Sequence, residues 1–196
     1  MKLDIIISGV GGQGSVLASR ALAGAGMGLG LDVRTSEIIG MAQREGSVTS
    51  QVRIGEQLFG ATIPDHEADI LLGFELAETI RALPKLKPGG VIIASSSAIV
   101  PVSVQLGISS YDREAMRRYL REQPGKVVML DLDELAKSTG SLKTGNVIIL
   151  GALSTLPGLP FEPEQLLQAV LNLIPEKLQN TNKRAFEVGR RAMEVA

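Results

Sequence analysis

A glycine-rich turn near the start of the chain has the residue types and spacing to bind an anion. Residues 9–14 read Gly-Val-Gly-Gly-Gln-Gly, which matches G-x-G-x-x-G, and they follow the short apolar segment 3–8. Such glycines allow a tight turn, close approach of an anionic group and close packing of the next helix on the strand. The first amides of that helix would point at the anion. The alternative is a turn that needs glycines only for packing. The candidate binding residues are Gly9, Gly11, Gly12, Gln13 and Gly14.

A second group of polar residues lies in a loop between two glycines. Gln43 and Arg44 stand between Gly40 and Gly46. An arginine in such a loop can make a forked, two-bond contact with a carboxylate or a phosphate. The alternative is an ordinary solvated charge. If the preceding strand is parallel to the first, this loop leaves the same sheet edge as the glycine turn, where ligands of open α/β sheets bind.

Glu37 is the residue that would complete a dinucleotide site. An acidic side chain near the end of the second strand contacts the ribose hydroxyls in such sites, and Glu37 lies in the predicted strand 33–39. However, the following segment 47–54 alternates like a strand, and a hairpin turn at 55–57 and a further strand over 58–63 are predicted after it, where a dinucleotide-binding half would place a helix. This order argues against an ordinary NAD site.

The remaining polar clusters have simpler structural explanations. His66 lies among polar residues and is predicted to be a surface side chain, since no nucleophile is recognisable nearby. Asp133 is predicted to cap a short helix over 134–137, rather than to bind a metal with its acidic neighbours. The serines at 95–97 either bind a ligand or cap a turn. The sequence therefore predicts no catalytic residue and no metal site in this chain.

The order of elements predicts an α/β fold. It is Rossmann-like, with a mostly parallel sheet, helices on both faces, a β-hairpin insertion after the second strand and helices at the C-terminal end. We expect residues 1–196 to form one domain. Further strands are predicted over 68–74, 91–94 and 126–130, and helices over 15–29, 75–83, 111–123, 146–156, 163–174 and 181–195.

Composition excludes several classes of function. The net charge is −1, so no global field attracts nucleic acid or an anionic membrane. The sequence contains no cysteine, which excludes thiolate-bound iron–sulfur clusters and thiolate catalysis in this chain. No apolar run approaches the roughly 20 residues that span a bilayer, and no signal-peptide pattern is visible. We expect a cytoplasmic protein.

The two polar segments together resemble a known family more specifically than either does alone. The strings 9–14, 36–48 and 52–55 are similar to those of the gamma-type subunits of 2-oxoacid:ferredoxin oxidoreductases. Within that family, the beta subunits of indolepyruvate ferredoxin oxidoreductases are the most similar. The likeness extends over nearly the whole chain. One departure is Glu45, which stands where the family usually has a glycine after Gln-Arg.

The resemblance implies a subunit that is inactive alone. The family oxidatively decarboxylates a 2-oxoacid to an acyl-CoA and passes the electrons to ferredoxin. Thiamine diphosphate and iron–sulfur clusters perform this chemistry in a partner subunit, so we expect a hetero-oligomer and no cofactor held by this chain alone. The glycine turn, Glu37, Gln43 and Arg44 would then contact a phosphate of coenzyme A or shape the subunit interface.

Two other functions remain open at this point. A stand-alone NAD-dependent dehydrogenase is favoured only by the glycine spacing, and an absence of NADH binding would exclude it. A non-enzymatic nucleotide-binding or assembly module would be favoured by a stable monomer whose catalytic partner is fully active without it.

Overall fold

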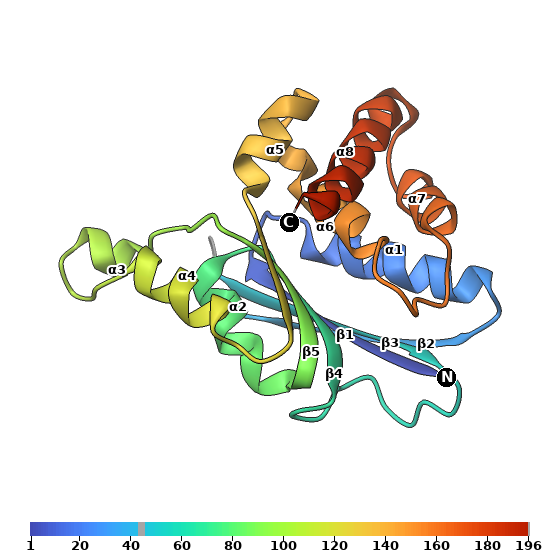
Figure 1. Cartoon of the computed structure of the whole chain (residues 1–196), viewed down its shortest axis with the longest axis horizontal. Helices are drawn as coiled ribbons and strands as arrows, with labels where there is room; N and C mark the ends of the chain where they lie inside the picture. The colour runs from blue at the N-terminus through green and yellow to red at the C-terminus, as the bar shows by residue number, and fades with distance from the viewer. Residues whose placement is uncertain (43–45, 196) are drawn as a thin grey trace.

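A six-stranded mixed sheet forms the centre of the computed structural model, which describes residues 1–42 and 46–195 (Figure 1). The spatial order of the strands is β2-β3-β1-β4-β5-β6. β3 is antiparallel to both of its neighbours, whereas β1, β4, β5 and β6 are parallel. β2 therefore runs in the same direction as β1, and β3 alone is reversed. The strands are β1 (Lys2–Val10), β2 (Asp32–Ile39), β3 (Ser47–Gly55), β4 (Ala68–Gly73), β5 (Leu86–Ser95) and β6 (Lys126–Leu130).

Helices cover both faces of this sheet (Figure 1). α2 and α4 lie on one face, and α1, α6, α7 and α8 lie on the other. This arrangement confirms the predicted α/β fold with a mostly parallel sheet. The helices are α1 (Ser15–Gly28), α2 (Leu76–Ala82), α3 (Val102–Gln105), α4 (Arg113–Arg121), α5 (Leu132–Thr139), α6 (Gly145–Leu153), α7 (Pro163–Asn172) and α8 (Glu176–Glu194), with 3₁₀ turns at Leu83–Lys85 and Leu142–Thr144.

The apolar run of β1 serves both layers of the core. Ile5 and Ile7 point into the cluster beneath α1 and α6, and Ile6 points into the cluster on the α2 face. All three side chains are fully buried. Successive strand residues point to opposite faces, so a strand covered on both sides requires a continuous apolar segment. The core therefore fixes β1 firmly, and the glycine turn begins at its end.

The predicted hairpin is displaced toward the N-terminus. β2 and β3 form it, whereas the strand expected over 58–63 and its turn at 55–57 are wrong: this segment is irregular. Leu58 and Ile63 are buried as their apolar character requires. The backbone groups of this segment, however, form hydrogen bonds with side chains of β3 instead of with a neighbouring strand. The Ile63 amide donates to Gln51 Oε1 (2.6 Å), and the Arg53 guanidinium donates to two carbonyl groups of the segment.

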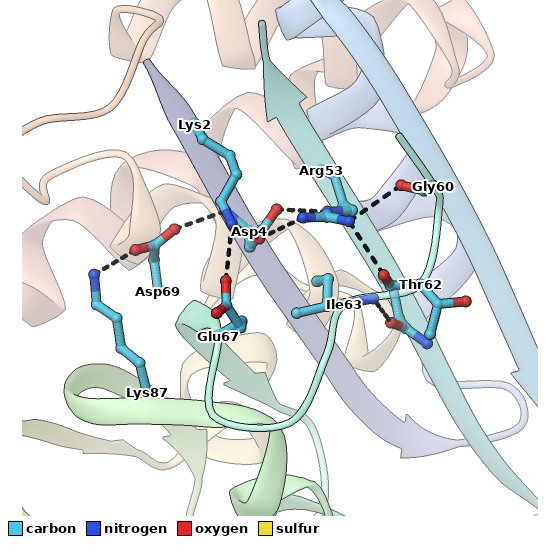
Figure 2. Close-up of polar contacts among 10 residues, drawn as sticks. Lys2, Asp4, Arg53, Gly60, Thr62, Ile63, Glu67, Asp69 and Lys87 are labelled. Atoms are coloured by element: carbon cyan, nitrogen blue, oxygen red, sulfur yellow. Dashed lines mark hydrogen bonds and ion pairs between the residues drawn. The ribbon is translucent and has the colours of Figure 1, made fainter. Parts of the chain in front are cut away.

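A buried ion pair anchors this segment to the sheet (Figure 2). Asp4 on β1 is fully buried and receives two hydrogen bonds from Arg53 on β3, at 2.9 and 3.1 Å. The same guanidinium donates to the carbonyl oxygens of Gly60 and Thr62 at 3.3 and 3.2 Å. Lys2 adds a partly exposed ammonium 3.0 Å from Asp4. Because the pair is shielded from water, its loss leaves a charge that solvent cannot easily stabilise.

The helix predicted after β6 has a different cap from the expected one. Asp131, not Asp133, is the cap: its carboxylate accepts the amide of Glu134 at 3.0 Å. The helix α5 begins at the next residue, Leu132, and runs to Thr139. β6 ends at Leu130, so the next residue is the first with free geometry for capping. Across residues 1–42 and 46–195, we find no helix with both the length and the apolar character that crossing a membrane requires.

Candidate functional site

The glycine turn joins the end of β1 to the start of α1. Gly9 still belongs to β1 and pairs with Val48, while Gly11 and Gly12 form the turn itself. Gly14 is the N-cap residue of α1 and has φ of 83°, in the left-handed region where a side chain is strained. The predicted strand–turn–helix context is therefore present.

Gln13 is used to hold the turn rather than to offer a free amide. Its Oε1 accepts the amide of Val10 at 2.9 Å, and its Nε2 donates to the carbonyl oxygen of Phe74 at 3.0 Å. The Gly11 amide is also occupied, because it donates to the carbonyl oxygen of Gly46 at 2.8 Å. These bonds fix the turn against the end of β4 and the start of β3. Gln13 and Gly11 are thus positioning groups in this conformation.

Asn146, at the start of α6, packs directly on Gly14. Its Nδ2 donates to the Gly14 carbonyl oxygen at 3.4 Å, and a Cβ on Gly14 would collide with the same amide group. Its Oδ1 accepts the amide of Val147 at 2.9 Å. The close approach brings the first turn of α6 beside the first turn of α1. Sequence pattern alone does not mark Asn146 as a site residue, because its partner Gly14 lies 132 positions away along the chain.

A cavity of about 260 Å³ lies where these two helices begin. It opens beyond the carboxyl ends of β4, β5 and β6, the edge at which ligands of open α/β sheets bind. Neither N-cap residue, Gly14 of α1 or Thr144 of α6, caps its helix with a side chain, and neither first turn holds an acidic residue. Asn146 accepts the Val147 amide of α6. The positive ends of two helix dipoles therefore meet at one cavity. Its lining includes Gly12, Gln13, Phe74, Ser95, Ser97, Leu142, Gly145 and Asn146.

Two charged side chains flank this cavity. Lys143 and Asp133 both line it and are exposed. Asp133 lies in the first turn of α5, whose dipole stabilises its carboxylate. The formal charges of the two side chains cancel, so the helix ends are the main source of positive potential at the cavity. Ser95 Oγ, also in the lining, accepts the Ser97 amide at 3.0 Å.

A second cavity, of about 250 Å³, adjoins the first and contains two buried carboxylates. Glu75 caps α2 by accepting the Glu78 amide at 3.0 Å, and its other oxygen accepts bonds from Tyr111 and from the Ile99 amide. Glu78 pairs with Arg81 and accepts the hydroxyl of Ser47. Burial, together with the neighbouring Glu75 carboxylate, raises the pKa of Tyr111. Each carboxylate is fully engaged, so this cluster holds elements together.

Glu37 is not placed for a dinucleotide ribose. It is exposed on β2, and its carboxylate accepts the Ser19 hydroxyl at 3.4 Å. β3 lies between β2 and β1, so a ligand extending from the glycine turn to Glu37 would have to cross a strand. Gln43 and Arg44 lie outside the described residues. The described ends of their loop are near the site, because Gly46 bonds Gly11 and Ala42 lines the second cavity.

Other parts of the molecule are less suited to ligand chemistry. His66 is exposed on the turn before β4, far along the chain from the glycine turn. A cavity of about 410 Å³ lies at the opposite sheet edge, but two of its lysines, Lys2 and Lys87, are already paired with carboxylates. Within the described part of the chain, no three His, Asp or Glu side chains are grouped for a metal ion.

Comparisons with known proteins agree on one family. The model of the pyruvate ferredoxin/flavodoxin oxidoreductase family matches residues 4–192. Indolepyruvate oxidoreductase subunit IorB of Thermococcus kodakarensis is 39% identical, over 97% of this chain and 96% of that protein.

Two solved structures share the fold. The gamma subunit of keto/oxoacid ferredoxin oxidoreductase from Geobacter sulfurreducens has a TM-score of 0.76 at 24% identity, covering 100% of this chain and 98% of that one. A 2-oxoglutarate:ferredoxin oxidoreductase from Magnetococcus marinus, solved with 2-oxoglutarate, coenzyme A and succinyl-CoA bound, has a TM-score of 0.75 at 22% identity. The match covers 100% of this chain but 31% of that chain. The same fold thus occurs as a separate chain and as part of a longer one.

Proposed function

Because the chain belongs to the pyruvate ferredoxin/flavodoxin oxidoreductase family and is a subunit of a 2-oxoacid:ferredoxin oxidoreductase, we propose that its complex acts on indolepyruvate or a related aryl 2-oxoacid. The complex oxidatively decarboxylates this substrate, forms the acyl-CoA and passes the electrons to ferredoxin. The substrate assignment is supported by the 39% identity to an indolepyruvate oxidoreductase subunit over nearly the full length of both chains.

The cofactors belong to a partner subunit in this proposal. Iron–sulfur clusters are held by cysteine thiolates, and this sequence has no cysteine. Thiamine diphosphate would supply the carbanion chemistry of decarboxylation when bound in the partner. This chain then contributes binding and orientation at the edge where its cavities lie. A hetero-oligomer is the form in which it acts.

The cavity between α1 and α6 is proposed to receive a phosphate group of coenzyme A. The observation that carries this proposal is that two helices whose N-cap residues provide no side-chain cap begin at one cavity. Its volume of about 260 Å³ falls below the roughly 300–1,000 Å³ of sites that enclose a drug-sized ligand. The cavity would therefore hold one end of the molecule, and the remainder would extend to the partner subunit.

Charge substitutions at the cavity should change anion affinity in opposite directions. With inorganic phosphate as the probe, Lys143→Gln should weaken binding to the isolated chain about threefold, and Asp133→Asn should strengthen it by a similar factor. One charge near a helix start is worth about 0.3–1 kcal/mol at low ionic strength. Lys177→Gln, an exposed lysine on α8, is the matched control and should leave the affinity unchanged. Calorimetric titration measures all three. Equal affinity in every variant would place the anion elsewhere.

The loop that holds Arg44 provides a test in the assembled enzyme. Arg44→Ala should lower the turnover of the reconstituted complex, while thermal unfolding of the isolated chain stays unchanged. A guanidinium that contacts a phosphate or the partner interface contributes to binding or orientation in the complex and not to the core. Steady-state kinetics with Arg44→Lys as the companion variant separate loss of charge from loss of the forked geometry. Unchanged kinetics for Arg44→Ala would make Arg44 an ordinary surface charge.

A further inference from the structure

An apolar arm, residues 100–110, projects from the body of the molecule (Figure 1). It contains the single-turn helix α3 and follows β5. Hydrogen bonds within the arm fold it back on itself. The hydroxyls of Ser103 and Ser109 are hydrogen-bonded at 2.8 Å, and the Ile108 amide donates to the Ser103 carbonyl oxygen at 2.8 Å. The arm thus has a defined shape of its own without a large contact with the rest of the chain.

The base of the arm is fixed to the sheet on both sides. Arg117 of α4 donates two bonds to the Ser96 carbonyl oxygen, at 3.2 and 2.7 Å. The Glu75 carboxylate accepts the Ile99 amide before the arm and the Tyr111 hydroxyl after it. The buried Glu75 side chain therefore bonds both ends of the arm. The arm is presented in a set direction.

The surface of the arm is unusual for a region that faces water. Val102, Leu106 and Ile108 are 63%, 68% and 75% exposed. The sequence between Lys87 and Asp112 contains no charged residue, so the arm carries no charge at any position. Clusters of exposed apolar side chains mark interaction sites on soluble proteins, and the centres of interfaces are depleted in charge.

The arm is continuous with an apolar rim around the candidate site. Ile99 at its base lines both cavities, and Val102 lines the second cavity together with Ala42. Exposed apolar side chains also stand at the end of β2, across three strands from β5, and beside the first cavity: Ile38, Ile39, Met41 and Leu142. Apolar side chains are thus exposed at several places along the edge at which the ligand is proposed to bind.

We propose that the arm inserts into an uncharged, apolar groove of the partner subunit that carries thiamine diphosphate and the iron–sulfur cluster. This inference rests on the proposed function. Because this chain has no cysteine, a partner must bring the iron–sulfur clusters close to its cavities. Such a partner would cover the edge of the cavities, and the arm begins at that edge, where Ile99 lines the first cavity. The absence of charge on the arm sets the chemistry of that groove, because a groove charge left unpaired against the arm would be costly to bury.

Paired aspartate substitutions test the arm directly. In Leu106→Asp/Ile108→Asp, the isolated chain should keep its thermal unfolding midpoint, because both side chains are exposed, while its affinity for the partner subunit of the same organism falls at least tenfold. Leu178→Asp, an exposed leucine on α8, is the matched control and should change the affinity less than twofold. Biolayer interferometry with tagged wild-type and variant chains gives the dissociation constants.

Site-specific crosslinking provides a second readout that does not depend on how aspartates affect folding. Because the chain lacks cysteine, Ser110→Cys can carry a photo-crosslinker at one position, with Asn180→Cys on α8 as control. The arm position should crosslink to the partner subunit and the control should not. Wild-type affinity of the aspartate variant, or an absence of crosslinks from the arm in an active complex, would overturn the arm proposal. Self-association of the chain that the arm variant abolishes would instead identify a second copy as the occupant. A wild-type chain that binds no such partner would contradict the proposed function itself.

Discussion

Arg53→Met should lower the free energy of unfolding by about 3–5 kcal/mol, the cost of breaking a buried pair by removing one partner. The Asp4 carboxylate is fully buried and would keep only Lys2, whose side chain is 40% exposed. The substitution also removes the two bonds to Gly60 and Thr62 that hold the irregular segment before β4 (Figure 2). Urea denaturation of the isolated chain at neutral pH measures the change.

Two comparison variants show whether the effect comes from the orphaned charge. Asp4→Leu/Arg53→Met replaces both charges by apolar groups and should be more stable than Arg53→Met alone. Lys137→Met breaks an exposed ion pair with Glu134 on α5 and should leave the urea midpoint unchanged, since exposed pairs contribute little to stability. An Arg53→Met protein with the wild-type midpoint would show that the pair does not stabilise the fold.

Gly189→Ala should be similarly damaging, with a loss of about 3 kcal/mol, at the upper end of the usual cost of overpacking a core. α6 and α8 cross with their backbones in contact. A Cβ on Gly189 would collide with the Ile148 carbonyl oxygen, and one on Gly151 would collide with the Phe186 carbonyl oxygen. Backbone atoms cannot rotate away as a side-chain end does, so the helices must separate and expose the buried Phe186.

Gly28→Ala is the control for this prediction. Gly28 ends α1, and an added Cβ would meet no atom within 4 Å. Alanine there should keep or slightly raise the thermal midpoint, because it reduces the freedom of the unfolded chain. Calorimetry should therefore show a lower midpoint for Gly189→Ala and an equal or slightly higher one for Gly28→Ala. A Gly189→Ala midpoint equal to that of the wild type would mean that the helices can separate without cost.

Local patterns predicted the elements that carry the glycine turn. The apolar run of β1, the small residues of α1 and the short apolar runs of β4 and β6 are short-range signals, and the structure has all of these elements. The strand predicted over 58–63 was wrong because side chains of β3, those of Arg53 and Gln51, bond the backbone of this segment. The local sequence pattern does not reveal such contacts. The apolar residues at the two ends of the segment, Leu58 and Ile63, are buried, but Phe59 between them is exposed and the segment is irregular.

The chemistry of the site depended on contacts that sequence spacing does not reveal. Asn146 meets Gly14 across 132 positions of sequence, so the shared cavity of α1 and α6 follows only from how the helices pack. Gln13 was a candidate ligand residue by its position in the turn, yet both ends of its amide are bonded within the protein. Glu37 lies where the linear order predicted, but β3 separates it from the turn.

Reconstitution of the oxidoreductase complex shows whether this chain is a subunit that works only together with its partner. Ferredoxin reduction by indolepyruvate and coenzyme A is followed by absorbance with this chain alone, with the subunit that carries thiamine diphosphate and iron–sulfur clusters alone, and with both. We predict substrate-dependent reduction in the mixture and none with this chain alone. Turnover by the isolated chain, with NAD or with ferredoxin, would contradict the proposed function, as would a partner subunit that is fully active without this chain.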